Sequence, residues 1–170
     1  MRSISRMGKN PYLGYKKPIN ILIVHENRLD YHTQKAHRLA VWMKETSEFN
    51  PIIDTDYFDR NKNYSKHQIN EIEKFMANLA KAFIRLIPPS SKLGESRHEG
   101  PLREINKAIN AGKPVIEIFY YCARDSPNRS LREKNYKYRI PIHLKRGESL
   151  QKAIRRGWEI YLRIKQEELE

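Results

Sequence analysis

The sequence contains one cysteine, Cys122, few glycines and no long apolar run. A single cysteine excludes an internal disulfide and a cysteine-based zinc cluster, which fits a reducing cytoplasm. The longest apolar stretches, ILIV and AFIRLIPP, are far shorter than the roughly 20 residues that a membrane-spanning helix needs. The N-terminus also lacks the apolar core of a signal peptide. We therefore expect a cytoplasmic protein that makes no membrane contact.

Acidic residues are scarce relative to basic ones. The chain of 170 residues has 20 Asp and Glu against 33 Lys and Arg, which gives a formal net charge of +13. A field of this sign attracts anions before any specific contact forms, so on charge alone nucleotides, nucleic acids and acidic lipids all qualify, and the expected absence of membrane contact leaves the first two as candidate partners. The length and the 39% of hydrophobic residues suit one domain with one core.

Short apolar runs and helical stripes alternate along most of the chain. Residues 1–19 differ, because they contain basic residues and prolines but no acid and no periodicity. We expect a basic flexible arm there, followed by a single α/β domain at 20–170. The runs that predict strands are residues 20–25, 51–55, 82–89, 114–121 and 138–143. Strands that alternate with helices pair in parallel, so this order predicts a flavodoxin-like three-layer sandwich with a five-stranded, mainly parallel sheet.

Apolar residues at helical spacing identify the faces that the helices should bury. The stripe expected for the second helix consists of Ile69, Ile72, Phe75, Met76 and Leu79. The stripe expected for the last helix consists of Leu150, Ala153, Ile154, Trp158, Tyr161 and Leu162. Pro141 in the last strand predicts an edge of the sheet, since proline has no N–H to donate to a neighbour.

Glu104 belongs to a helix that should begin at Gly100 and Pro101 and end at Gly112, a left-handed cap. This places Glu104 in the first turn, at the edge where parallel strands end and ligands usually bind. One explanation is structural, because the helix dipole favours an acid there by roughly 0.3 to 1 kcal/mol. The other is catalytic. A carboxylate on the rim of a positive protein suits an anionic substrate whose sugar becomes positively charged when its N-glycosidic bond breaks.

Further residues at the same edge are candidates for substrate binding, and each has a structural alternative. They are His25, Arg28, Asp54, Tyr57, Phe58, Ser91 and Ser96. Arginine suits a phosphate, the two rings suit a stacked base, and the serines suit hydrogen bonds to sugar or phosphate. The rings equally suit packing against the sheet edge, and serines are common in polar loops. The six histidines form no i, i+4 pair, so we predict no metal site.

The segment EINKAINAGKPVI, residues 104–116, resembles the end of a TIR domain, the Toll/interleukin-1 receptor-like module. In that family a helix bearing a glutamate leads through Gly-Lys into an apolar strand. Three further segments are similar to the opening strand and first helix, the second strand, and the closing strand and helix of the family. They are residues 19–45, 51–59 and 138–162. The resemblance thus extends over nearly the whole chain from Pro18 onward.

The resemblance implies an activity. Prokaryotic TIR domains commonly hydrolyse or cyclise NAD with the glutamate of this helix, often in antiphage defence and after oligomerisation. By this resemblance Glu104 is the catalytic residue, NAD or a related nucleotide is the substrate, no cofactor is needed, and a homo-oligomer is expected. The chain departs from the family at Val24 and His25, where a serine and an aromatic residue or histidine are usual. It departs again at Gly100 and Pro101, where a tryptophan often precedes the glutamate.

Three alternatives remain open on the sequence. Loss of the usual serine and tryptophan favours a TIR-type interaction module without catalysis. Nucleoside deoxyribosyltransferases share the glutamate spacing, but they usually have glycine where this chain has Asn106, and a glycine-rich first loop that is absent here. A nucleic-acid-binding protein is the third alternative. Lys and Arg far outnumber Asp and Glu between residues 124 and 165, where Tyr136 and Tyr138 are interleaved.

Overall fold

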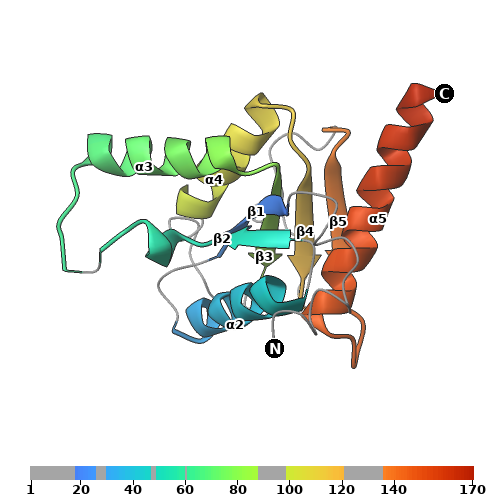
Figure 1. Ribbon diagram of the computed structural model, residues 1–170, viewed down its shortest axis with the longest axis horizontal. Helices are drawn as coiled ribbons and strands as arrows, with labels where there is room; N and C mark the ends of the chain where they lie inside the picture. Colours follow the sequence, from blue (N-terminus) through green and yellow to red (C-terminus); the bar gives the residue numbers. More distant parts are fainter. Residues whose placement is uncertain (1–17, 26–29, 47–48, 60, 88–98, 121–135) are drawn as a thin grey trace, which may run out of the picture.

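A single five-stranded sheet forms the centre of the protein (Figure 1). The computed structural model describes residues 18–25, 30–46, 49–59, 61–87, 99–120 and 136–170. The strands are β1 (Ile19–Val24), β2 (Phe49–Ile52), β3 (Ala82–Ile87), β4 (Val115–Phe119) and β5 (Arg139–His143). They lie in the order β2-β1-β3-β4-β5, and every neighbouring pair is parallel. The predicted α/β flavodoxin-like fold is confirmed, with a sheet that is parallel throughout rather than mainly parallel.

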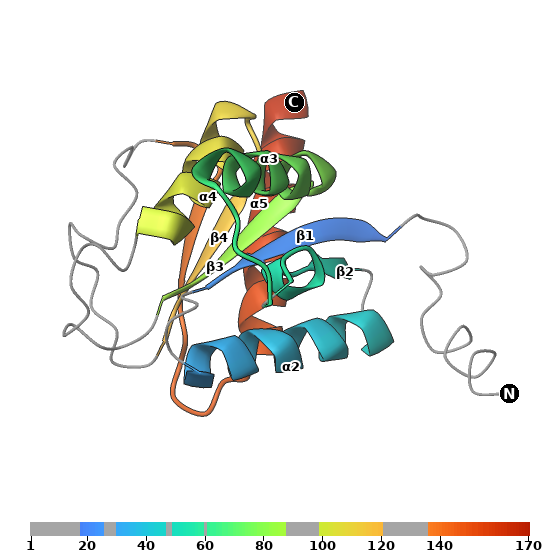
Figure 2. The ribbon, with the colours of Figure 1, turned by 90° about the vertical axis from the view of Figure 1, so that its left-hand side faces the viewer.

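Helices cover both faces of this sheet. They are α2 (Asp30–Thr46), the short 3-10 helix η2 (Asp54–Asp56), α3 (Lys66–Leu79), α4 (Glu99–Asn110) and α5 (Leu150–Leu169). One core cluster joins α2 and α5 to the sheet, and a second joins α3 and α4 to its other face. Figure 2 shows α2 on one side of the sheet and α3 and α4 on the other. The three layers follow from strands that are apolar on both faces.

The predicted edge position of the last strand is confirmed. β5 pairs only with β4 in the described sheet, and Pro141 is exposed there. β2 forms the opposite edge and ends at Ile52, before the expected end at residue 55. The chain then turns into η2, where the N–H groups of Asp56 and Tyr57 donate to the carbonyls of Ile53 and Asp54. An aspartate whose backbone closes a turn no longer extends the strand.

Three side chains predicted to be buried are exposed. Phe75 and Leu79 on α3 are 55% and 37% exposed, and Leu162 on α5 is 48% exposed. α3 instead turns Glu73, Met76 and Ala77 inward. On this face Met76 and Ala77 pack into the core, and the buried Glu73 carboxylate forms ion pairs with Arg103 and Lys107 of α4.

Two glycines fix the ends and the spacing of the helices. Gly112 has φ of +69°, the left-handed conformation predicted for the cap of α4. Gly157 lies on α5 where a Cβ atom would be 2.6 Å from Cγ2 of Ile116 on β4. Only glycine therefore lets α5 approach the sheet this closely.

Residues 1–17 of the predicted arm lie outside the described residues, and β1 already begins at Ile19. Among the helices of the described ranges, none has the length and apolar character required to cross a membrane.

Candidate functional site

Glu104 lies in the second turn of α4. The helix begins at Glu99, one residue before the expected start, so the prediction of a first-turn position is wrong. The helix dipole acts mainly within the first turn and therefore does not account for this acid. Ile105 and Ala108 on the same helix are fully buried against the sheet, whereas Glu104 is partly buried. The acid is thus held at the margin of the core rather than on a solvated helix face.

The environment of Glu104 favours its protonated form. Burial, followed by the negative charges of Glu73 and Asp54, raises the pKa of its carboxyl group from 4.5 to about 8. Lys107 and Arg103 act in the opposite direction but do not compensate. Within the described part of the chain, the Glu104 carboxyl group makes no hydrogen bond or ion pair. A carboxyl group with these properties is typical of a functional site.

The two cations that flank Glu104 on α4 are directed to Glu73 instead. Arg103 Nη2 donates to Glu73 Oε1 at 2.9 Å, and Lys107 Nζ donates to Glu73 Oε2 at 3.1 Å. Glu73 is only 4% exposed, so it needs both partners to offset the cost of burying its charge. This arrangement keeps the neighbouring guanidinium bonded to Glu73 and, among the residues that the structure describes, leaves the Glu104 carboxyl group without a salt bridge.

His25 and Asp54 form a pair at the carboxyl end of β1. His25 is buried, and its Nε2 donates a hydrogen bond to Asp54 Oδ1 at 3.3 Å. The backbone N–H of Thr55 donates to the same oxygen at 2.9 Å. Thr55 Oγ1 and His37 Nε2 on α2 share a further hydrogen bond of 3.3 Å. These contacts fix the Asp54 carboxylate where its charge acts on Glu104.

Tyr57 and Phe58 pack against protein, in agreement with their structural interpretation. The Tyr57 ring lies 5.9 Å from the ring of Phe75, and the Phe58 ring lies 5.4 Å from that of Tyr64. Both rings also contact the core between the sheet and α3 and α4. They are partly buried, so each keeps some surface for a ligand. A role in stacking a base stays a prediction.

The structure brings His25, Asp54 and Glu104 to the same edge of the sheet. Tyr57 and Phe58 come immediately after the end of η2 in the chain. Arg28, Ser91 and Ser96 lie outside the described residues, so their predicted contacts stay untested. In the described ranges, no three His, Cys, Asp or Glu side chains are grouped to hold a metal ion.

The sequence analysis missed a buried charge cluster within the sheet. Arg85 on β3 and Glu117 on β4 are 3% and 0% exposed, and Arg85 Nη1 donates to Glu117 Oε2 at 3.0 Å. Arg139 on β5 donates to the other oxygen of Glu117. A charged residue inside an otherwise apolar strand was the available signal, both in AFIRLI and in VIEIF. This cluster ties the three strands together on the face covered by α4.

Solved structures share this architecture. No protein-family model matches the chain, and no curated protein matches it. A prokaryotic SEFIR domain superposes with a TM-score of 0.52 at 15% identity, over 81% of this chain and 88% of that domain. The fold is TIR-like. At this identity the similarity shows the fold alone.

Two further solved structures share the architecture of this chain. One is the CMP N-glycosidase BcmB from Clostridium botulinum, with a TM-score of 0.51 and 16% identity over 78% of this chain and 95% of that one. The other is a conserved protein from Enterococcus faecalis V583, with a TM-score of 0.50 and 11% identity over 65% of this chain and 69% of that one.

Proposed function

We propose that this TIR-like protein cleaves the N-glycosidic bond of NAD or a related nucleotide, with Glu104 as the catalytic residue. The observation that carries the proposal is the Glu104 carboxyl group, which is partly buried beside Asp54 and makes no salt bridge among the described residues. The net charge of +13 attracts the phosphates of such a substrate. The glycosidase named among the structures of like fold gives further support.

In this reaction the bond between the sugar carbon and the base nitrogen breaks, and its electron pair leaves with the base. The sugar is left as an oxocarbenium-like species, which an ionised Glu104 stabilises or traps as an ester. Water then attacks the sugar carbon. If the ester has formed, its bond between the sugar carbon and the Glu104 oxygen breaks and the carboxylate is regenerated, and the proton of the water is released to solvent or to a neighbouring base. In this proposal Asp54 accepts hydrogen bonds from sugar hydroxyls, and its contacts with His25 and the Thr55 N–H support that role because they orient the carboxylate.

The protonation state of Glu104 separates two substrate classes. Nicotinamide leaves NAD as a neutral molecule because its ring nitrogen is already cationic, so that reaction needs only the ionised carboxylate. Cytosine leaves CMP as an anion unless it receives a proton, and a protonated Glu104 would supply one. The positive nicotinamide ring would also favour ionisation of Glu104 on binding.

Incubation of concentrated protein with NAD and, separately, with CMP tests the proposal, with free nicotinamide or cytosine measured by chromatography. We expect one base to be released, and Glu104→Gln to lower the rate by at least about a hundredfold. Glu71→Gln is the matched control, because Glu71 is exposed on α3. Base release that persists in Glu104→Gln would exclude this residue as catalytic. Release of neither base would exclude both of these substrates.

A second candidate function is a TIR-type interaction module that binds another copy of the chain. The exposed apolar side chains of Phe75 and Leu79 on α3, beside the Tyr57 ring, favour it. Sedimentation of the wild type and of Phe75→Ser distinguishes this function. Self-association that is lost in Phe75→Ser and unchanged in Glu104→Gln supports the module, whereas a monomer at all concentrations contradicts it.

A further inference from the structure

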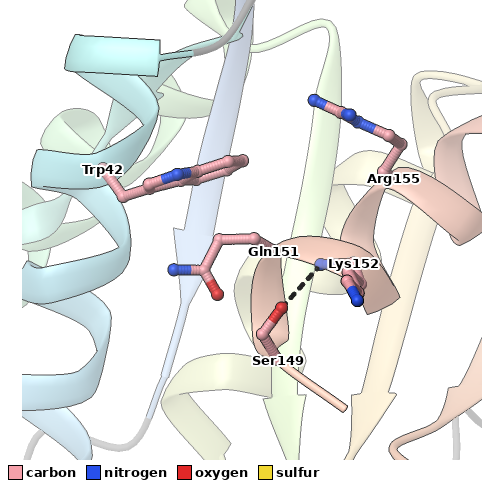
Figure 3. A pocket seen from close by; sticks show the side chains of 5 residues that line it. All are labelled: Trp42, Ser149, Gln151, Lys152 and Arg155. Atoms are coloured by element: carbon pink, nitrogen blue, oxygen red, sulfur yellow. Dashed lines mark hydrogen bonds between the residues drawn. The ribbon is translucent and has the colours of Figure 1, made fainter.

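A groove lies between α2 and the start of α5, on the face of the sheet opposite α4 (Figure 3). Its volume is about 360 Å³. Trp42 reaches into it from α2, and the other lining residues come from the N-terminal end of α5 or precede it. Those residues are Ser149, Gln151, Lys152 and Arg155. The sheet separates this groove from Glu104, so it is distinct from the candidate catalytic site.

The groove combines one flat aromatic surface with two positive charges. Within the described residues, Lys152 Nζ and the Arg155 guanidinium make no ion pair or hydrogen bond. The nearest acid along the chain, Glu148, is already bonded to Arg156 at 2.8 Å. Two cations one helical turn apart, with no counterion in the described part of the chain, are suited to an anion, and guanidinium in particular binds phosphate through two parallel hydrogen bonds.

The remaining lining groups suit a heterocyclic base. Stacking of a base on an aromatic side chain contributes roughly 1 to 3 kcal/mol, and the indole of Trp42 offers such a surface. The Gln151 amide presents an N–H donor and an oxygen acceptor side by side, and this side chain makes no hydrogen bond with the described residues. The edge of a nucleobase offers the matching acceptor and donor.

We propose that this groove binds a nucleoside monophosphate, with the base against Trp42 and the phosphate between Lys152 and Arg155. The size supports one nucleotide rather than two, because 360 Å³ is near the lower limit of about 300 Å³ for small-molecule pockets. The site does not depend on the proposed glycosidase activity, since it shares no residue with the Glu104 edge. The lining residues of the groove include no carboxylate that could act as Glu104 does, so in this proposal its ligand is bound and not consumed.

Fluorescence of Trp42 tests this site directly. The chain has two tryptophans, so Trp158→Phe leaves Trp42 as the single reporter. Trp158 packs edge-on against Phe49, and phenylalanine retains an aromatic ring there. Glu104→Gln is added so that the probe, AMP, is not hydrolysed. We expect AMP to quench Trp42 saturably, and adenosine or inorganic phosphate alone to bind at least tenfold more weakly.

Charge-matched variants decide whether the groove is the site. Lys152→Gln with Arg155→Gln should weaken AMP binding at least tenfold. Lys74→Gln with Arg163→Gln removes the same charge from exposed positions on α3 and farther along α5, and should change it less than twofold. The proposal would be overturned if AMP did not quench Trp42, or if both pairs of substitutions weakened AMP binding equally. It would also be overturned if adenosine bound as tightly as AMP. Tighter and more salt-dependent binding of a single-stranded oligonucleotide would also overturn it and assign the groove to nucleic acid.

Discussion

Replacement of Glu104 by glutamine should stabilise the protein, by an amount that depends on pH. The folded state raises the pKa of this acid from 4.5 to about 8, mainly because the side chain is buried. The folded protein therefore binds the proton more tightly than the unfolded chain does. The contribution of Glu104 to the free energy of unfolding is therefore most favourable at low pH, where the acid is protonated in both the folded and the unfolded state. It falls as the pH rises from 4.5 towards 8. Glutamine stays neutral and avoids this loss.

The size of the effect follows from the two pKa values. Each pKa unit corresponds to 1.36 kcal/mol, so Glu104 costs less than about 1 kcal/mol at pH 5, about 3 kcal/mol at pH 7 and at most about 5 kcal/mol above pH 8. For a domain of this length, 1 kcal/mol changes Tm by about 2 to 4 °C. Glu104→Gln should therefore raise Tm by about 2 °C at pH 5 and by about 10 °C at pH 7.

Calorimetry of wild type, Glu104→Gln and the exposed control Glu71→Gln at pH 5, 6, 7 and 8 measures this difference. The control should follow the wild type at every pH, because its side chain is solvated in both states. A gain in Tm that is the same at pH 5 and pH 7 would refute the reasoning. A lower Tm for Glu104→Gln at pH 7 would refute it as well, since the carboxylate would then be stabilised by a partner.

Three further results are expected. If NAD is the substrate, its cleavage should accelerate as the pH rises towards 8, whereas cleavage of CMP should slow over the same range; steady-state rates between pH 6 and 9 distinguish them. Glu73→Gln should lower the pKa of Glu104 by removing a negative charge and releasing two cations, so the same rate profile should move to lower pH. Gly157→Ala should destabilise the fold by about 1 to 3 kcal/mol in urea, because the added methyl group meets Ile116 at 2.6 Å.

The alternation of elements was readable from the sequence because each strand is a short apolar run between polar turns. The runs NILIVH, AFIRLI and VIEIF correspond to the three central strands β1, β3 and β4. Because these strands are buried on both faces, apolar residues do not alternate with polar ones along them. Helix rotation was less predictable. Phe75 fits the apolar stripe of α3 as well as Met76 does, and the observed face combines core packing of Met76 and Ala77 with long-range ion pairs of Glu73 to α4, which the stripe does not encode.

The candidate site was predicted in part. Position alone identified Glu104, since the helix after the third strand must begin near the ligand-binding edge of a parallel sheet. Its position in the second turn follows from the start of α4 at Glu99. Its raised pKa depends on burial and then on the charges of Glu73 and Asp54, which are distant in sequence and act on it only after folding. The hydrogen bond between His25 and Asp54 spans 29 residues and has no local signature. Long-range contacts of this kind carry no periodicity that a sequence pattern could reveal.

The close approach at Gly157 concerns one wall of the groove between α2 and α5. A Cβ atom there would lie 2.6 Å from the Ile116 side chain and 3.3 Å from that of Ile142, so α5 is packed tightly on the sheet at this point. The other wall is α2, which carries Trp42 and, five residues earlier, His37, whose ring is hydrogen-bonded to Thr55 beside Asp54. A ligand that displaced Trp42 would therefore act on the same helix that holds this contact at the acidic edge.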